Sequence, residues 1–368
     1  MDPSAIIADR MSQIDSSGIR KVFDLASELK DPINLSIGQP DFDVPEPIKA
    51  SAMHAIETGQ NKYTVTQGIQ KLRDSVLRYE KKQTGVKHSD VLITSGVSGG
   101  ILLAYMALLN PGDKVAIPDP YFVMYKHLCR LIGGEPLYVD TYPDFHLTVE
   151  QLEEAGAADA KLLVLNSPAN PTGAIVRDKD MKQIARWADK NDVFILSDEI
   201  YRTFTYDGKC PSAASYTDNV LLLNGFSKSC AMTGWRLGYA IGPEPVLEEM
   251  KKLQQFSFVC APSIAQHAGV VALGMSPELH VRAYQAKRDI LYEGLKRRFR
   301  LNKPEGAFYA FVEAPGGDGD AFCRRAIEHS VLVIPGSVFS ERKTHFRVSF
   351  AAEDGVIEEG VDVLCSLA

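Results

Sequence analysis

The sequence lacks the features that would place it in a membrane or secreted class of proteins. Its longest apolar run, Ile101 to Leu109, falls well short of the roughly 20 residues that a membrane-spanning helix needs. Charged residues at Asp2, Asp9 and Arg10 interrupt the start of the chain, so no secretory signal pattern is present there. We therefore expect neither membrane insertion nor export.

Cysteine spacing and charge exclude further classes. The six cysteines are scattered without any Cys-x-x-Cys spacing, which predicts neither a metal site nor a disulfide framework and makes a reducing cytoplasm the expected location. Forty basic and 47 acidic residues give a net charge of −7, which argues against general binding to nucleic acid or anionic membranes. The glycine patterns of dinucleotide and nucleoside-triphosphate sites are also absent.

What is present is the composition of a large globular protein, with 368 residues of which 45% are hydrophobic. Apolar strands alternate with helices along most of the chain. The strands are expected at residues 91–95, 114–117, 136–139, 162–166, 193–197, 220–223 and 237–241. Continuously apolar strands separated by helices indicate a mainly parallel sheet covered on both faces. We predict a doubly wound, seven-stranded α/β domain over residues 41–272.

The last hundred residues follow another pattern. A long charged helix around Val281–Arg300 precedes strands at 307–312, 331–334 and 345–350 and helices at 320–329 and 353–364. We predict a smaller α+β domain, formed by residues 273–368 together with residues 1–40, which include an amphipathic helix from Val22 to Leu29.

Polar residues follow the strands of the predicted sheet, and in open α/β sheets ligands bind at this edge. Gly96–Gly100 follows the first strand and opens a helix, whose free N–H groups suit a phosphate, with Ser98 as a further donor. Tyr121 and Phe122 follow the second strand and offer an aromatic face to a planar ring. The alternatives are a ligand-free glycine turn and ordinary core packing.

Three more side chains follow later strands. Prolines and a glycine fix Asn170 as a hydrogen-bond donor, and Asp198 lies beside an apolar strand, where a carboxylate needs a cationic partner. Lys228 follows the sixth strand, and desolvation there would make its amine a nucleophile. The alternatives are a helix cap for Asp198 and a solvated surface lysine for Lys228. Together the five features suit pyridoxal phosphate.

At this point the chain resembles a known family, the fold-type I pyridoxal-phosphate aminotransferases of the aspartate/aromatic subgroup. The resemblance covers nearly the whole length and is carried by motifs in the same order: Ile37-Gly-Gln-Pro-Asp-Phe, Asn166-Ser-Pro-Ala-Asn-Pro-Thr-Gly, Ser197-Asp-Glu-Ile-Tyr, Ser227-Lys, Met232-Thr-Gly-Trp-Arg, Pro304-Glu-Gly-Ala-Phe-Tyr and Phe346-Arg-Val-Ser.

The resemblance implies roles around the cofactor ring. Lys228 would bind the cofactor covalently and, once displaced by substrate, would move the proton at the substrate α carbon. Asp198 would pair with the ring nitrogen and keep it protonated. Asn170 and Tyr201 would hydrogen-bond the phenolic oxygen of the ring, and Phe122 would stack on its face. The catalytic residues implied in this way are Lys228, Asp198 and Tyr201.

The resemblance also implies contacts at both ends of the site. Val97, Ser98 and Arg236 would hold the phosphate, and Arg347 would bind the substrate α-carboxylate in a bidentate fork that lysine cannot reproduce. Gly38 would let the backbone approach the substrate, where Asn170 would also contribute.

Two further positions bear on the phosphate. Tyr63 would reach the phosphate of the neighbouring subunit, which implies a homodimer with shared active sites. Gly225 departs from the family pattern, since many relatives have a serine three residues before the lysine, and the site would then lack one phosphate donor.

The expected reaction is transfer of the α-amino group of aspartate or an aromatic amino acid to a 2-oxo acid such as 2-oxoglutarate. The alternative on the same scaffold is a lyase that eliminates the β substituent of cysteine conjugates. A non-catalytic regulator and a nicotinamide dehydrogenase are disfavoured, because a DNA-binding segment and the dinucleotide pattern are both missing. Arg20 is a candidate partner for an acidic substrate side chain, against the alternative of a surface role.

Overall fold

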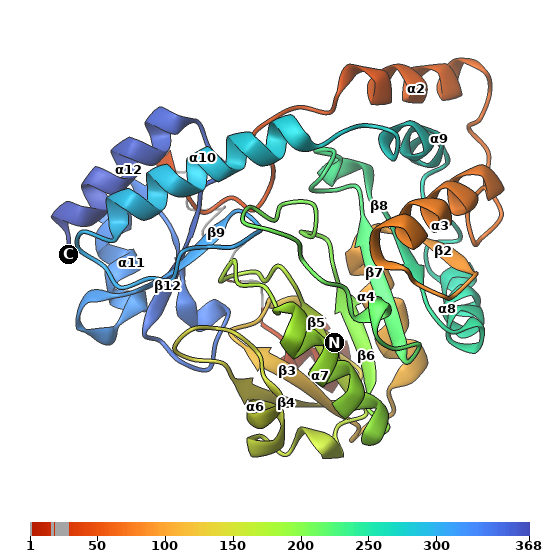
Figure 1. Ribbon diagram of the computed structural model, residues 1–368, viewed down its shortest axis with the longest axis horizontal. Coiled ribbons are helices and arrows are strands. Elements are labelled where there is room, and N and C mark those ends of the chain that lie inside the picture. Colours follow the sequence, from red (N-terminus) through yellow and green to blue (C-terminus); the bar gives the residue numbers. More distant parts are fainter. Residues whose placement is uncertain (1, 16–17, 19–28) are drawn as a thin grey trace.

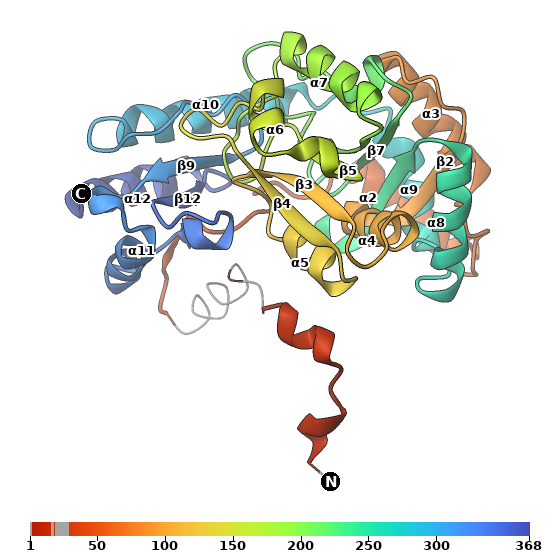
Figure 2. The same cartoon turned by 90° about the horizontal axis from the view of Figure 1, so that it is seen from below.

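The computed structural model describes residues 2–15, 18 and 29–368. Arg20 lies outside the described residues, and so does the helix predicted from Val22 to Leu29, except for its last residue. Before them, the short 3-10 helix η1 (Pro3–Ile6) extends away from the body of the molecule, as Figure 2 shows, whereas η2 (Asp9–Gln13) contacts the helix α5 (Met124–Leu131).

A seven-stranded sheet forms the larger part of the molecule (Figure 1), with the order β2-β8-β7-β6-β5-β3-β4. Its strands are β2 (Val91–Ser95), β3 (Lys114–Asp119), β4 (Glu135–Asp140), β5 (Leu162–Asn166), β6 (Phe194–Asp198), β7 (Val220–Gly225) and β8 (Leu237–Ile241). Only β8 runs antiparallel to its neighbours. The predicted mainly parallel, seven-stranded sheet is confirmed.

Helices cover both faces of this sheet. One face carries α4 (Gly96–Leu108), α5 (Met124–Leu131) and α8 (Glu244–Phe256); the other carries α3 (Gln70–Thr84), α6 (Val149–Glu154), α7 (Asp178–Lys190) and α9 (Ser263–Ala272), with α2 (Glu46–Glu57) packed on α9. Successive strand residues enter different cores: Leu221 and Leu223 pack with α4, whereas Val220 and Leu222 join the core that contains α7. This two-sided burial explains why the strands are apolar throughout.

The C-terminal part has a second, antiparallel sheet in the order β11-β12-β9, formed by β9 (Tyr309–Glu313), β11 (Ile334–Pro335) and β12 (His345–Ser349). α11 (Gly319–Glu328) packs on this sheet, and α12 (Asp354–Ser366) packs against α10 (Glu278–Leu295). β1 (Ile33–Asn34) pairs with β10 (Val331–Leu332), so residues near the start of the chain lie beside the C-terminal part. The division at residues 41 and 272 stays a prediction.

The single strand predicted over residues 331–334 is wrong. The segment divides into β10 and β11, because Val331 pairs with β1 whereas Ile334 pairs with β12 in a different sheet. Short 3-10 helices join the remaining elements: η3 (Ala157–Asp159), η4 (Ala213–Ser215), η5 (Thr233–Trp235), η6 (Pro315–Gly317) and η7 (Gly336–Val338).

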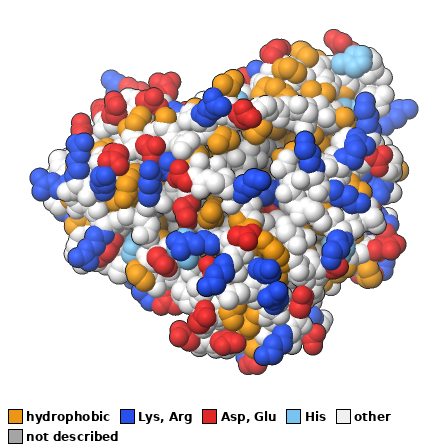
Figure 3. Space-filling model, in the orientation of Figure 1, with side chains coloured by type: hydrophobic (Ala, Val, Ile, Leu, Met, Phe, Trp, Pro, Cys, Tyr) orange, Lys and Arg blue, Asp and Glu red, His pale blue; other side chains and the backbone are white. Residues whose placement is uncertain are grey.

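The surface carries charges of both signs. Acidic and basic side chains alternate over the face in Figure 3, without a large area of one sign. Within the described part of the chain, no helix is long and apolar enough to cross a membrane, and no group of three or more His, Cys, Asp or Glu side chains could hold a metal ion.

Candidate active site

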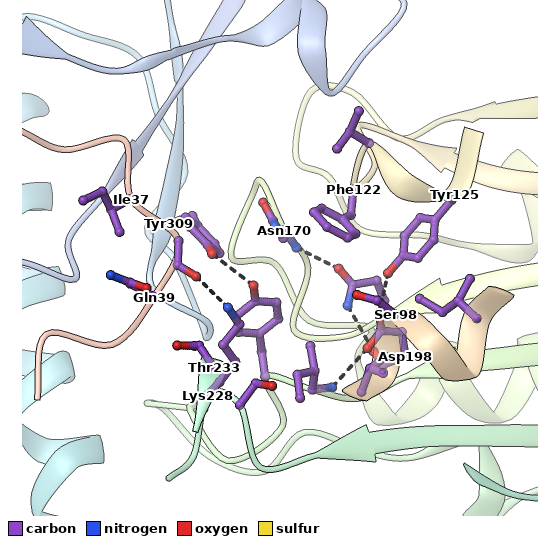
Figure 4. A pocket seen from close by; sticks show the side chains of 18 of the residues that line it. Ile37, Gln39, Ser98, Phe122, Tyr125, Asn170, Asp198, Lys228, Thr233 and Tyr309 are labelled. Carbon is purple, nitrogen blue, oxygen red and sulfur yellow. Dashed lines mark hydrogen bonds between the residues drawn. The ribbon is translucent and has the colours of Figure 1, made fainter. Parts of the chain in front are cut away.

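A cavity of about 460 Å³ opens at the carboxyl edge of the large sheet, where the second sheet meets it. Figure 4 shows side chains from both parts converging on it. Of the residues predicted for the site, ten line this cavity: Gly38, Val97, Ser98, Phe122, Asn170, Asp198, Tyr201, Lys228, Arg236 and Arg347. Tyr63 does not line it; its side chain is 83% exposed.

Lys228 and Arg236 both belong to the connection between β7 and β8. This connection is too short for a crossover helix, so β8 must start at the edge where β7 ends, and both residues stay at that edge. Nζ of Lys228 donates a hydrogen bond of 2.6 Å to the carbonyl oxygen of Gly38. Burial, together with the charges of Arg347 and Arg236, lowers the pKa of Lys228 to about 8. The lysine therefore lines the cavity as a usable amine, not as a solvated surface residue.

Arg236 lies at the N-terminus of α4. Its backbone is left-handed, with φ of 53°, and Nη1 donates to the carbonyl oxygen of Thr233 at 2.9 Å. Gly96, the first residue of α4, has a φ of 67°, which other residues rarely adopt, and a Cβ placed on it would lie 2.7 Å from the guanidinium. Ser95, at the N-cap of this helix, makes no side-chain capping hydrogen bond. A guanidinium and free N–H groups thus converge, and such a place binds anions, phosphate in particular.

Asp198 lies at the end of β6 and is buried. Oδ2 accepts a hydrogen bond of 2.7 Å from the hydroxyl of Tyr125, and Oδ1 accepts one of 3.2 Å from the amide of Ile200. Burial raises the pKa of Asp198 to about 6, while the bond from Tyr125 acts in the opposite direction. No Lys or Arg among the described residues forms an ion pair with Asp198, so a cationic group of a ligand would fill that role.

Arg347, on β12, is buried between two aromatic rings, with its guanidinium 4.4 Å from the centroid of Tyr309 and 4.6 Å from that of Phe339. Nη1 donates to Oδ1 of Asn170 at 2.9 Å, and Nη2 donates to the carbonyl oxygen of Ser36 at 2.8 Å. Nε has no partner in the described structure. Burying a charged guanidinium with only neutral partners costs desolvation free energy, and a carboxylate ligand would offset that cost.

Aromatic side chains line the remaining wall. The hydroxyl groups of Tyr201 and Tyr309 lie 3.0 Å apart, and the ring of Phe122 packs edge-to-face on Tyr125, with centroids 5.7 Å apart. Tyr125 and Tyr309 were not predicted as site residues. Tyr309 lay inside a motif used for the resemblance, but Tyr125 is one aromatic residue within an ordinary amphipathic helix and gave no signal.

The departure at Gly225 has a steric reason. A Cβ on Gly225 would lie 2.9 Å from Cα of Gly238 and 2.9 Å from the carbonyl oxygen of Leu237. Both atoms belong to the paired strand β8, whose backbone cannot yield without disturbing the sheet. A serine does not fit here unless the backbone moves, so Arg236 and the N-terminus of α4 remain as the anion-binding groups at this end.

The fold and the cavity together define an α/β protein with a lysine amine in a cavity that two arginines also line. A profile described as "Aminotransferase class I and II" matches residues 30–364. The chain belongs to the class I and II aminotransferase family and is an aminotransferase.

Named relatives support this assignment. A probable aspartate aminotransferase of Methanocaldococcus jannaschii is 37% identical, over 98% of this chain and 99% of the relative. Aromatic-amino-acid aminotransferase 2 of Thermococcus litoralis is also 37% identical, over 97% of this chain and 96% of the relative. The structure of Thermus thermophilus aspartate aminotransferase with maleate has a TM-score of 0.94 at 31% identity, and the match covers 98% of this chain and 99% of that one.

Proposed function

We propose that this aminotransferase uses pyridoxal 5'-phosphate to move the α-amino group of an L-amino acid to a 2-oxo acid by a ping-pong mechanism. The observation that carries the proposal is the position of Lys228. Its amine has a lowered pKa and lies in one cavity with a buried carboxylate, Asp198, and with the anion site at Arg236. Pyridoxal phosphate presents an aldehyde, a basic ring nitrogen and a phosphate, and the cavity has a matching group for each.

When bound, the cofactor supplies an electron sink for the electrons released at the substrate α carbon. The chain would supply the rest. Asp198 would hold a proton on the ring nitrogen, and Asn170 and Tyr201 would donate to the phenolic oxygen. The amine of Lys228 would take the α proton and return it. Arg347 would bind the α-carboxylate through Nη and the free Nε, which would hold the α carbon within reach of Lys228.

Aspartate or an aromatic amino acid is the proposed donor, and 2-oxoglutarate the proposed acceptor. The support is the family of named relatives, which includes both aspartate and aromatic aminotransferases. No contact in the described part of the chain favours the β-lyase alternative.

The test is a half-reaction. The purified holoenzyme receives one amino acid at a time with no 2-oxo acid present, and absorbance follows the bound cofactor. We expect one equivalent of 2-oxo acid per site and complete conversion of the cofactor to its amine form. Addition of 2-oxoglutarate then restores the starting spectrum. Ammonia released in repeated turnovers without an acceptor would instead support the lyase.

The proposal includes a homodimer in the cytoplasm. All six cysteines are free thiols, as expected in a reducing compartment. Tyr63 lies outside the cavity of its own protomer, and an exposed position is required of a residue that completes the site of a partner.

Hybrid dimers test this arrangement. Lys228→Ala and Tyr63→Ala protomers are each expected to be weakly active alone. In a hybrid, the site with an intact Lys228 receives an intact Tyr63 from the other protomer. Random assortment should therefore restore about a quarter of the wild-type activity. No gain on mixing, although exchange of protomers is confirmed by mass spectrometry, would place Tyr63 outside the site.

A further inference from the structure

Two buried tyrosines lie behind Asp198, on the face of the sheet that α4 and α5 cover. Tyr125 comes from α5 and Tyr105 from α4, with 2% and 0% of their surfaces exposed. The hydroxyl of Tyr125 donates to Oδ2 of Asp198 at 2.7 Å, the contact that Figure 4 draws between the two labelled side chains. The hydroxyl of Tyr105 has no hydrogen-bond partner in the described structure.

Tyr125 also contacts a second wall of the cavity. Its ring meets that of Phe122 edge-to-face, at an angle of 82° between the planes. This is a favoured geometry for an aromatic pair and restricts the tilt of both rings. A single side chain thus contacts the carboxylate proposed for the edge of the cofactor ring and the aromatic residue proposed for its face.

We propose that Tyr125 is a positioning residue: its hydroxyl holds Asp198 as an oriented carboxylate toward the cofactor ring nitrogen, and its ring holds Phe122 against the cofactor face. The inference rests on the proposed use of pyridoxal phosphate. Tyr125 acts on the cofactor only through these two neighbours.

The charge on Asp198 depends on this hydroxyl. The titratable groups that interact with Asp198 are Tyr105 from α4, Tyr125 from α5, the neighbouring Glu199, Tyr201 three residues further on, and Lys228 after β7. Burial and the charge of Glu199 raise the pKa of Asp198, whereas the bonds from Tyr125 and the amide of Ile200 and the charge of Lys228 lower it. Loss of the hydroxyl raises the pKa of Asp198. The carboxylate then becomes neutral at a higher pH and no longer pairs with a protonated ring nitrogen.

The test compares Tyr125→Phe with Tyr105→Phe. Both changes remove one buried hydroxyl and keep the ring, but only Tyr125 donates a hydrogen bond to a charged group. The measurement is the dissociation constant of pyridoxal phosphate for the apoenzyme between about pH 5 and about pH 8, since Asp198 titrates in this range. Thermal unfolding checks that both variants are folded.

We expect Tyr125→Phe to weaken pyridoxal phosphate binding about tenfold at pH 7, because a hydrogen bond to a charged group is lost. The acidic loss of affinity should also begin at a higher pH than in the wild type. The dissociation constant of Tyr105→Phe should stay within about twofold of the wild-type value at every pH, since the Tyr105 hydroxyl has no hydrogen-bond partner to lose. Wild-type affinity and an unchanged pH profile for Tyr125→Phe would overturn the inference.

A double-mutant cycle shows whether Tyr125 acts through Asp198. In an Asp198→Asn background, Tyr125→Phe should weaken binding by no more than about twofold, because the charged acceptor is gone. A full tenfold loss of affinity in the Asp198→Asn background would contradict the proposal that Tyr125 acts through Asp198. If the wild-type apoenzyme binds no pyridoxal phosphate at all, the proposed function fails. If the wild type binds pyridoxal phosphate and Tyr125→Phe binds it equally well, only the inference about Tyr125 fails.

Discussion

The two ends of the cavity each present an arginine that has no acidic partner among the described residues, yet the two arginines lie in very different surroundings. Arg236 is exposed, with a left-handed backbone and one hydrogen bond to a backbone carbonyl. Arg347 is 1% exposed, lies between two aromatic rings and donates two hydrogen bonds to neutral oxygens. Between them lies the amine of Lys228.

The difference fits two kinds of anion. A phosphate keeps much of its hydration and can be held at an open end by a guanidinium together with helix N–H groups. A substrate carboxylate must be placed to within a fraction of an ångström beside the reacting carbon, and a desolvated, preorganised guanidinium does this best. The open end, at Arg236, therefore suits the proposed resident cofactor, and the closed end, at Arg347, suits the proposed substrate, which exchanges in each turnover.

The largest effect is expected at the residue between the two ends. Lys228→Ala removes the amine but neither arginine, so the variant should still bind pyridoxal phosphate and an amino acid. Turnover should fall by at least about 10⁴-fold, because the nucleophile and the proton carrier are lost together. Steady-state kinetics and absorbance of the bound cofactor measure the two properties. Activity near the wild-type level would show that Lys228 is not the reacting amine.

Arg347→Lys tests the closed end. The charge remains but the fork is lost, so kcat/KM for amino acid donors should fall roughly 10- to 100-fold. The affinity for pyridoxal phosphate should hardly change. Equal losses of cofactor and substrate affinity would remove the distinction between the two ends.

Arg236→Gln is the complementary change at the open end. The dissociation constant of pyridoxal phosphate should rise roughly tenfold, because a charge-assisted contact to the phosphate is lost. With the cofactor at saturation, KM for the amino acid should stay close to the wild-type value. Arg282→Gln, an exposed site on α10, is the matched control and should change neither. A change in substrate KM alone would place the carboxylate, not the phosphate, at Arg236.

The pH dependence of cofactor uptake should give an effect no larger than that of Arg236→Gln, and it is measured on the wild-type protein. Only the neutral amine of Lys228 reacts with an aldehyde, and its pKa is lowered to about 8. The rate at which the apoenzyme takes up pyridoxal phosphate should therefore rise with pH and level off above about pH 8; at pH 7 it should be about tenfold below the plateau. A rate that still climbs steeply toward pH 10 would indicate an ordinary, solvated lysine.

Much of the site could be predicted because it follows strand ends. The apolar strands mark where the sheet stops, and parallel strands bring Asn170, Asp198 and Lys228 to one edge. The position of these residues directly after predicted strands was sufficient to place them at the same edge of the sheet.

The residues that were missed depend on contacts between distant elements. Tyr125 reaches Asp198 across 73 positions, and Tyr309 reaches Tyr201 across 108, and no local pattern encodes either pair. No helix was predicted over residues 263–272, where α9 lies, because the buried face of this helix consists largely of Ala and Gly, which gives little apolar periodicity. A single strand was predicted from Val331 to Ile334 because the sequence does not show that the two residues pair in different sheets.

One measurement tests the central claim most directly. The holoenzyme, loaded with pyridoxal phosphate, is reduced with borohydride, digested and mapped by mass spectrometry. The account predicts a single stable adduct, on Lys228, formed in one equivalent per chain, and no adduct after the same treatment of Lys228→Ala. An adduct on another lysine, or spread over surface lysines with none on Lys228, would contradict it.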